Sequence, residues 1–397
     1  MNLTTKKNWK TVKLGDVALQ MFSGGTPSSQ DKSFYGGDIP WLRTQEVTFN
    51  YIYETELKIT EEGFKNSSTK WVPPNNVIIA MYGNSAGRVA YSTIPLTTNQ
   101  ACCNIVADTE KINSKFLYFL LKGQYKKLEN MATGGAQQNL SVGVLKDYEI
   151  KIPESIDEQR EVAGVLGCLD DKIELLRKEN KTLEEMAQTL FKEWFVNFNF
   201  HGATGRMIDS ELGEIPEGWR LGKLYDLVNV MYGFPFKSEF FNEENIGMPL
   251  IRIRDLKDGS PAIYTNEDCG SQYVIKRGDI VAGMDAEFRP SIWVGHNGVL
   301  NQRVCKFTPK NVKVSNYFVY WLVKPHLEFF EKTKGGTTVS HLGKSDLDSI
   351  EVVVPATDIL EKFSDVVDTL FCKTVNNFSE IQTLSKSRDQ LLDKIFN

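Results

Sequence analysis

The chain has 397 residues, a formal net charge of −5, 41% hydrophobic residues and a mean hydropathy of −0.30. This length is too great for one ordinary domain and suits two or three domains. No run of about 18 apolar residues occurs, which excludes a membrane-spanning helix and indicates a soluble globular protein without a membrane partner.

The first residues and the cysteines bear on the cellular setting. The N-terminal sequence MNLTTKKNWK lacks the apolar core of a signal peptide. The cysteines form no CxxC pair and have no nearby histidine at the spacing of metal ligands. They occupy positions 102, 103, 168, 269, 305 and 372. We therefore expect buried or incidental thiols, no metal site and a reduced, cytoplasmic environment.

Residues 1–153 are predicted to form a first domain of mixed α/β structure. Short β-rich runs are interrupted by Gly, Pro and Asn, which is typical of twisted strands joined by long loops. One amphipathic helix is expected at 114–130, followed by a polar loop with a glycine pair at 134–141 and a strand that ends at Pro153. The strands expected before the helix are 77–81, 88–92 and 104–107.

Residues 154–199 are predicted to contain a long central helix, from 156 to 195. Ten positions are spaced alternately four and three residues apart, as in the seam of a coiled coil. These positions are Val162, Leu166, Leu169, Ile173, Leu176, Asn180, Leu183, Ala187, Leu190 and Trp194. Asn180 places one polar residue at the middle of the seam. A helix with such a seam needs a partner.

Residues 221–356 repeat the motifs of the first domain in the same order, which predicts a second domain with the same fold. Three corresponding pairs of segments are IPWLRTQEV at 39 and MPLIRIRDL at 248, PNNVIIAMYG at 74 and KRGDIVAGMD at 276, and TTNQACCNIV at 97 and GVLNQRVCKF at 298. The repeat also predicts a helix at 315–332 and a strand that ends near Pro355. Residues 200–220, between the copies, are rich in glycine and charge and lack periodicity, which indicates a connector.

Residues 357–397 are predicted to form a distal long helix. Ten positions again alternate by four and three, with Asn377 in the middle. They are Phe363, Val367, Leu370, Thr374, Asn377, Ile381, Leu384, Arg388, Leu391 and Ile395. If the helices run antiparallel with Asn180 opposite Asn377, the two seams begin and end together. The alternative is that each helix packs only on its own neighbouring domain.

Several motifs and their order resemble one known family. LGDV begins at residue 14, GGTP occupies Gly24 to Pro27, DEQR follows the strand that ends at Pro153, and SELGEIPEGW follows a helix ending in LFKEWFV. Over its whole length the chain thus resembles the specificity subunit of type I restriction-modification enzymes. In that family two target-recognition domains each read half of a split DNA sequence, and two long helices fix their separation and dock two methyltransferase subunits. The second copy departs from the pattern, with GFPF at 233 in place of GGTP and ILEK at 359 in place of DEQR.

The resemblance implies a non-catalytic subunit that binds double-stranded DNA. Adenine methylation and cleavage would come from two methyltransferase subunits and from restriction and translocase subunits, and SAM, ATP and Mg would be bound by those partners. The residues agree with this interpretation. The string Val72-Pro73-Pro74-Asn75 lacks the acidic and aromatic residues of a methyltransferase motif. The string HLGKS at 341 lacks the first glycine of a phosphate-binding loop, because position 338 is threonine.

Candidate base-reading residues are side chains that can present hydrogen-bond donors and acceptors in a DNA groove, where Arg suits guanine and Asn or Gln suits adenine. The candidates are Arg43, Gln45, Ser85, Arg88, Asn99, Gln100, Gln137, Gln138 and Asn139 in the first copy, and Arg252, Arg254, Arg289, Asn301, Gln302, Arg303, Thr337 and Thr338 in the second. Candidate phosphate contacts are Lys32, Lys237 and Lys334. Because the Asn-Gln pairs occur in both copies, the alternative is that they hold the fold through backbone hydrogen bonds.

The distribution of charge indicates where DNA would bind. Residues 154–193 contain eleven acidic and six basic residues, so the rest of the chain is neutral. An acidic helix is an unfavourable surface to lie along phosphates, and we expect the domains at the helix ends to hold the DNA. The seam spans roughly 50 Å at about 1.5 Å per residue, which suits half-sites about one turn of DNA apart.

We therefore predict an α+β protein with two tandem mixed α/β target-recognition domains separated by two long antiparallel helices that form a coiled coil. Its predicted function is recognition of a bipartite, asymmetric DNA site as the specificity subunit of a type I restriction-modification complex. One alternative is the recognition subunit of a related enzyme that cuts on both sides of its site. Another is a structural adaptor whose domains bind protein.

Overall fold

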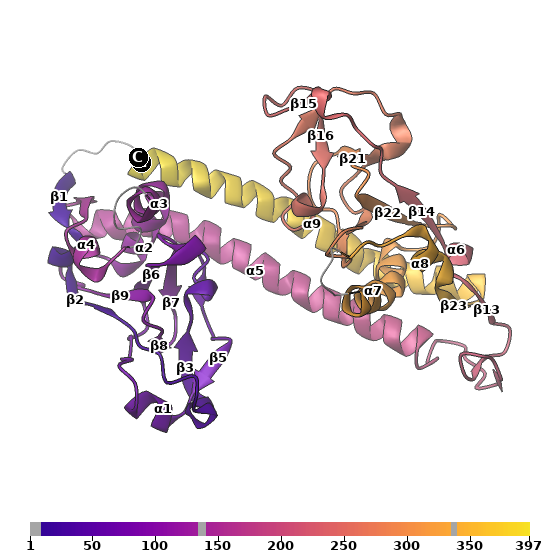
Figure 1. The fold of residues 1–397 in the computed structure, drawn as a ribbon, viewed down its shortest axis with the longest axis horizontal. Coiled ribbons are helices and arrows are strands. Elements are labelled where there is room, and N and C mark those ends of the chain that lie inside the picture. Colours follow the sequence, from indigo (N-terminus) through magenta and orange to yellow (C-terminus); the bar gives the residue numbers. More distant parts are fainter. Residues whose placement is uncertain (1–8, 134–139, 335–339) are drawn as a thin grey trace. The chain divides into compact units, whose positions relative to one another are not determined.

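The computed structural model describes residues 9–133, 140–334 and 340–397. The chain divides into two compact units. Unit 1 consists of residues 1–173 and 383–397, and unit 2 consists of residues 174–382. Two helices of 40 residues, α5 (Ile156–Phe195) and α9 (Thr357–Phe396), each contribute to both units (Figure 1). Their bounds agree with the predicted long helices.

Unit 1 is built on a five-stranded sheet in the order β2-β9-β6-β7-β4, with a smaller sheet β5-β3-β8 and a strand pair β1-β10. The larger sheet contains β2 (Ala18–Ser23), β4 (Tyr51–Ile52), β6 (Asn76–Ala80), β7 (Val89–Ser92) and β9 (Cys102–Ala107). The others are β1 (Trp9–Lys13), β3 (Tyr35–Leu42), β5 (Leu57–Ile59), β8 (Thr97–Thr98) and β10 (Glu149–Pro153). Strand β6 reads Asn-Val-Ile-Ile-Ala and is wholly buried, as expected for a β-branched run at the centre of a sheet.

Unit 2 repeats this arrangement. Its larger sheets have the orders β14-β22-β19-β20 and β15-β17-β16-β21-β18, beside the pair β13-β23. The strands are β13 (Arg220–Lys223), β14 (Val228–Tyr232), β15 (Phe241–Asn242), β16 (Met248–Ile251), β17 (Tyr264–Thr265), β18 (Val274–Ile275), β19 (Ile280–Gly283), β20 (Pro290–Ile292), β21 (Gly298–Leu300), β22 (Val304–Pro309) and β23 (Glu351–Val354). The order β14-β22-β19-β20 matches β2-β9-β6-β7, and the parallel pair β16-β21 matches β3-β8. The strand order agrees with the duplication predicted from the motifs.

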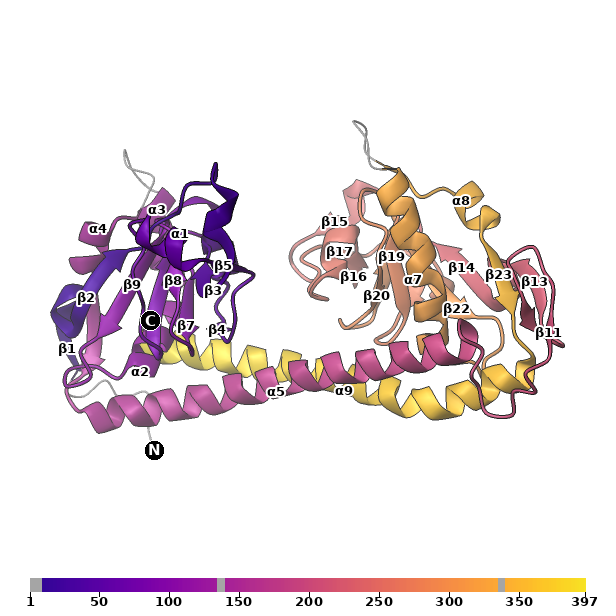
Figure 2. The same cartoon turned by 90° about the horizontal axis from the view of Figure 1, so that it is seen from below.

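A helix packs on the main sheet of each unit, and here the two copies differ. The single helix predicted at 114–130 is wrong, because α2 (Ser114–Gly123) and α3 (Tyr125–Thr133) are separate. Gln124 lies between them as the C-cap of α2, and its buried side chain accepts a hydrogen bond from Tyr148 (2.9 Å). In unit 2, α7 (Asn316–Thr333) is one helix and continues through Pro325 along β19, β20 and β22 (Figure 2). Two short helices, α4 (Val142–Lys146) and α8 (Lys344–Ser349), precede the last strands.

Each unit buries part of both long helices in its own hydrophobic core. In unit 1, Leu166 of α5 and Ile395 of α9 belong to the same buried cluster as the α2 side chains. Phe396 packs edge-on against Phe116 (5.5 Å between ring centroids) and lies 6.4 Å from the ring of Trp9. In unit 2, Ala187 and Phe363 belong to the cluster that includes α7. The two long helices are therefore part of both cores. Burial of each large apolar side chain contributes roughly 1.5–3 kcal/mol to the stability of the fold.

The two long helices also contact each other in the predicted register. In unit 2, Asn377 Nδ2 donates to Asn180 Oδ1 (2.9 Å), and the ring of Trp194 lies 5.6 Å from that of Phe363. The second contact lies 14 residues after Asn180 and 14 residues before Asn377, so the helices run antiparallel in this unit. None of the twenty predicted seam residues is exposed. The alternative, that each helix packs only on its domain, is therefore wrong, because both kinds of packing occur.

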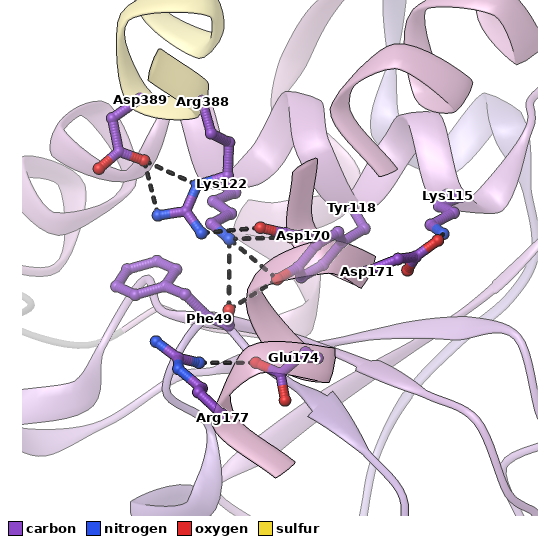
Figure 3. Close-up of polar contacts among 10 residues, drawn as sticks. All are labelled: Phe49, Lys115, Tyr118, Lys122, Asp170, Asp171, Glu174, Arg177, Arg388 and Asp389. Carbon is purple, nitrogen blue, oxygen red and sulfur yellow. Dashed lines mark hydrogen bonds and ion pairs between the residues drawn. The ribbon is translucent and has the colours of Figure 1, made fainter. Parts of the chain in front are cut away.

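In unit 1 the helices are joined by a buried ion cluster at Asp170 of α5 (Figure 3). Arg388 of α9 donates to one carboxylate oxygen (2.7 Å) and Lys122 of α2 to the other (3.3 Å). Lys122 also donates to the carbonyl oxygen of Phe49 (3.3 Å) and to the hydroxyl of Tyr118 (3.2 Å). The Lys122 and Asp170 side chains are only 7% and 6% exposed. Burial lowers the pKa of Lys122 to about 8, although the Asp170 carboxylate opposes this shift.

The connector is more ordered than its composition indicates. Strands β11 (Met207–Ile208) and β12 (Ile215–Pro216) form a small antiparallel pair. Trp219 is buried and stacks on Phe200, with ring centroids 5.3 Å apart. The segment therefore packs as part of unit 2, and periodicity could not predict this because single aromatic residues make the contacts.

Three further properties concern the described residues alone. Every helix in those ranges is too short or too polar to cross a bilayer. No three His, Cys, Asp or Glu side chains there converge as metal ligands would. All six cysteines are unpaired, and burial raises the pKa of the Cys103 and Cys305 thiols to about 12, which leaves both protonated and unreactive at neutral pH.

The Asn pair predicts opposite effects for single and double substitutions. Asn377 also donates to Glu179 (2.7 Å), and Asn180 Nδ2 lies 3.5 Å from the Thr374 carbonyl oxygen. Asn180→Leu alone removes one of the two hydrogen bonds of the Asn377 amide and leaves one buried donor unpaired, which should lower the Tm, since an unsatisfied buried polar group costs about 1–3 kcal/mol. Combined Asn180→Leu and Asn377→Leu should retain or raise the Tm, measured by circular dichroism. A single variant as stable as the unmodified chain would contradict this.

The ion cluster predicts a pH dependence of stability. Because burial lowers the pKa of Lys122 from 10.5 to about 8, the folded chain releases this proton more readily than the unfolded chain. The free energy of unfolding should therefore rise between these two pH values, by at most about 3 kcal/mol for this group. In Lys122→Met that contribution should be absent, as measured by urea unfolding at the two ends of the range. Lys126→Met, at an exposed lysine of α3, is the control and should retain the full rise.

Candidate nucleic-acid interface

In both units a glycine packs closely against the turn that contains the Asn-Gln pair. Gly24 N–H donates to the Cys102 carbonyl oxygen (3.2 Å), and Gly233 N–H donates to that of Val304 (3.0 Å). A Cβ atom on Gly24 would lie 2.1 Å from the Thr98 carbonyl oxygen, and one on Gly233 would lie 2.0 Å from that of Asn301. Only glycine allows this approach. GFPF therefore keeps the anchor of GGTP despite its different sequence.

The Asn-Gln pairs form corresponding turns in the two units. Asn99 N–H donates to the Leu42 carbonyl oxygen (3.0 Å), and Asn301 N–H donates to that of Ile251 (3.1 Å). The carbonyl oxygens of both asparagines accept from the residue three positions later. These contacts support the structural interpretation for the asparagines. Gln100 and Gln302 are exposed, and the Gln100 side chain accepts a hydrogen bond from Thr26.

Two candidates of the first copy share one carboxylate. Arg43 donates to Glu56 Oε2 (2.5 Å), and Gln45 Nε2 lies 3.4 Å from the same oxygen. Gln45 and Glu56 line an open hollow of about 380 Å³. The corresponding Arg252 of the second copy lies 3.4 Å from Asp255, three residues later. A carboxylate thus orients each of these arginines, and Gln45 has the more exposed position.

The other candidates of the first copy that lie in the described ranges are less exposed to solvent. Ser85 is partly buried, and its hydroxyl lies 3.4 Å from the Tyr82 carbonyl oxygen. Arg88 is also partly buried, and its Nε has no hydrogen-bond partner within the described ranges. These positions favour local packing over contact with a large ligand.

The basic candidates of the second copy differ in their availability. Arg254 is exposed. Arg289 makes two contacts of 3.0 Å with Glu331, so its guanidinium is already paired with a carboxylate. Arg303 is 54% exposed, and its Nε lies 3.5 Å from Asp285 Oδ2. Both Arg289 and Arg303 therefore combine exposure with a nearby carboxylate, and the contact of Arg289 is the closer one.

The lysine candidates also differ in whether the side chain is available to contact a phosphate. Lys32 and Lys237 are exposed. Lys334 donates to Asp346 (2.5 Å) and to the His341 carbonyl oxygen (3.1 Å), which indicates a structural role. Five candidates lie outside the described residues, namely Gln137, Gln138, Asn139, Thr337 and Thr338.

The same main-chain contacts bring three segments together in each unit. In unit 1, Met81 N–H donates to the Ala101 carbonyl oxygen (2.8 Å), and Leu140 N–H donates to that of Met81 (3.2 Å). In unit 2, Met284 and Arg303 repeat the first contact (2.9 Å), and Leu342 repeats the second (2.8 Å). We call this arrangement the matched frame. It joins the end of β6 or β19, the turn before β9 or β22, and the segment before α4 or α8.

One backbone angle just beyond the matched frame is also alike in the two units. The residue two positions after each methionine has a positive φ, 68° at Gly83 and 62° at Ala286. An alanine in this conformation is strained, whereas glycine is not. The two turns otherwise differ, because unit 1 continues into a 3-10 helix at Gly83–Ser85 and the corresponding residues of unit 2 do not form one.

At the matched frame, unit 2 brings together three polar side chains. His341 Nδ1 lies 2.8 Å from Asp285 Oδ1, and Arg303 Nε lies 3.5 Å from Asp285 Oδ2. Asp285 and His341 were not among the candidates predicted from the sequence. They are 56 residues apart, so no local spacing of residue types links them. One feature of the sequence could have indicated Asp285. It ends the copied motif KRGDIVAGMD, whereas the corresponding motif of the first copy, PNNVIIAMYG, contains no acidic residue.

Comparisons with known proteins find related sequences over nearly the whole chain. Residues 6–185 and 216–384 match the model of the type I restriction modification DNA specificity domain. The MjaIX specificity subunit of a type I restriction enzyme from Methanocaldococcus jannaschii is 31% identical over 98% of this chain and 93% of its own length. The HindI specificity subunit from Haemophilus influenzae is 22% identical over 98% of this chain and 99% of its own length. The crystal structure of a type I restriction-modification S subunit from M. genitalium has the same fold, with a TM-score of 0.61 at 17% identity over 100% of this chain and 98% of that chain.

Proposed function

The chain belongs to the family of type I restriction-modification DNA specificity subunits, and we propose that it reads a bipartite, asymmetric DNA site within such a complex. We assign one half of the site to the domain at residues 1–153 and the other half to the domain at 221–356. The observation that carries this proposal is the matched frame, where the same main-chain hydrogen bonds hold different side chains in the two units. Arg303 corresponds to Ala101, and Asp285 corresponds to Tyr82. Two domains of one fold with different polar groups at one position suit two different half-sequences.

The long helices are proposed to act as a coiled-coil spacer whose register is set by Asn180 and Asn377. A buried Asn pair specifies register because each amide is satisfied by the other only in one alignment. The contact between them and the burial of the seams support this role. The net acidic charge of residues 154–193 is unfavourable beside phosphates, which leaves DNA contacts to the domains.

We infer that the complex contains two methyltransferase subunits docked on the helices, together with restriction and translocase subunits. In this proposal SAM, ATP and Mg are bound by those partners, and methylation and cleavage take place there. This chain contributes recognition and spacing.

The first prediction of this proposal concerns activity. The purified chain should not transfer methyl groups from SAM to DNA, and the same chain with its methyltransferase partner should do so at one bipartite sequence. Incorporation of labelled methyl groups measures activity, and gel shifts with random duplexes, with and without the partner, measure binding. Methyl transfer by the chain alone would falsify the non-catalytic assignment. If no duplex binds in either arm, the chain is an adaptor for protein instead.

The second prediction concerns the spacer. Removal of residues 171–177 from α5 and 380–386 from α9 deletes one heptad from facing stretches of the predicted register and keeps Asn180 opposite Asn377. The unread gap between the half-sites should shorten by about three base pairs, since seven residues span about 10 Å of helix and each base pair about 3.4 Å of DNA.

Sequencing of the methylated sites tests this prediction. Both half-sequences should remain unchanged in the shortened variant. A control that deletes seven residues from α5 alone breaks the register and should abolish specific methylation. An unchanged gap in the double deletion would rule out the spacer role.

A further inference from the structure

The side chains at the matched frame of unit 2 form a connected group. The Asp285 carboxylate faces His341 Nδ1 with one oxygen (2.8 Å) and Arg303 Nε with the other (3.5 Å). Asp285 is 26% exposed, whereas His341 and Arg303 are 49% and 54% exposed. The carboxylate thus lies inward of two side chains whose outer atoms face solvent.

The orientation of each outer group follows from its contact with Asp285. A carboxylate only accepts hydrogen bonds, so the neutral His341 ring carries its proton on Nδ1 and has a free lone pair on Nε2. The contact through Nε leaves both terminal nitrogens of Arg303 available as a donor fork. With His341 in its neutral form, the group offers the two terminal donors of Arg303 and one acceptor, His341 Nε2.

Two of these side chains, Asp285 and Arg303, are not needed for the main-chain contacts at this position. The first copy forms the same main-chain contacts with Tyr82 in place of Asp285 and Ala101 in place of Arg303. The half-exposed Arg303 and His341 add little to the core, and exposed ion pairs contribute only about 0–1 kcal/mol. Side chains that these main-chain contacts do not require, at a position where the copies differ, are suited to selective contact with a ligand.

We propose that Asp285, Arg303 and His341 read one guanine–cytosine base pair in the second half-site. In the major groove this pair presents two acceptors, O6 and N7 of guanine, and one donor, the N4 amino group of cytosine. The Arg303 fork matches the two acceptors, and His341 Nε2 matches the donor. Asp285 is the positioning residue that fixes the Arg303 side chain and the tautomer of His341. This inference rests on the proposed function and adds the identity of one base pair to it.

Selection of methylated duplexes from a randomised pool tests the proposal. The complete chain is used with its methyltransferase partner, and the base preference is measured at every position of both half-sites. Arg303→Ala should lower the preference for guanine at one position of the second half-site about ten- to a hundredfold. His341→Ala and Asp285→Asn should weaken the preference at that same base pair, while the first half-site stays unchanged.

Arg206→Ala provides a matched control, because Arg206 is also an exposed arginine of unit 2 and pairs with an acidic residue, Glu217. This variant should keep every base preference. The Tm of Asp285→Asn, a change that preserves side-chain shape, should equal that of the unmodified chain, which separates positioning from folding. If the unmodified complex has a bipartite preference that Arg303→Ala leaves intact, this inference is wrong and the proposed function stands. If the unmodified complex has no sequence preference, the proposed function itself is wrong.

Discussion

Burial of the same two helices in the core of each unit is the constraint on which the rest of the structure depends. The helices α5 and α9 do not merely link two domains whose cores are complete without them. Leu166 and Ile395 belong to the core of unit 1, and Ala187 and Phe363 belong to that of unit 2. A helix with an apolar stripe needs a surface on which to bury it, and here the domain and the second helix together provide that surface.

The polar groups within the helix pair have a different role from the apolar ones. The ion pair of Arg388 with Asp170 and the amide contact of Asn377 with Asn180 are each buried. Such groups contribute little net stability after desolvation, yet each is costly when its partner is missing. This balance agrees with the proposed role of these groups in setting the register of the two helices. In unit 2, Lys324 of α7 lies 3.7 Å from Glu184 of α5, a longer contact between more exposed side chains than that of Lys122 with Asp170.

The sequence predicted the features that depend on regular spacing. The bounds of α5 and α9, their register in unit 2 and the likeness of the two domains follow from heptads and copied motifs. It failed where one side chain decides, as at Gln124, which ends α2, and at Trp219, which packs the connector. The candidate interface was predicted only in part. The pairing of Asp285 with His341 joins residues far apart in the chain, and no local pattern of residue types indicates it.

The position of residues 392–396 has a consequence for synthesis of the protein. Phe396 contacts Trp9 and Phe116, and Leu392 and Ile395 complete the same core. A ribosome makes the first domain long before it makes these residues, and proteins generally fold domain by domain from the N-terminus. Here the nascent first domain emerges with an open apolar face and must wait for the distal helix. The core of unit 1 is therefore completed only after the second domain has been made.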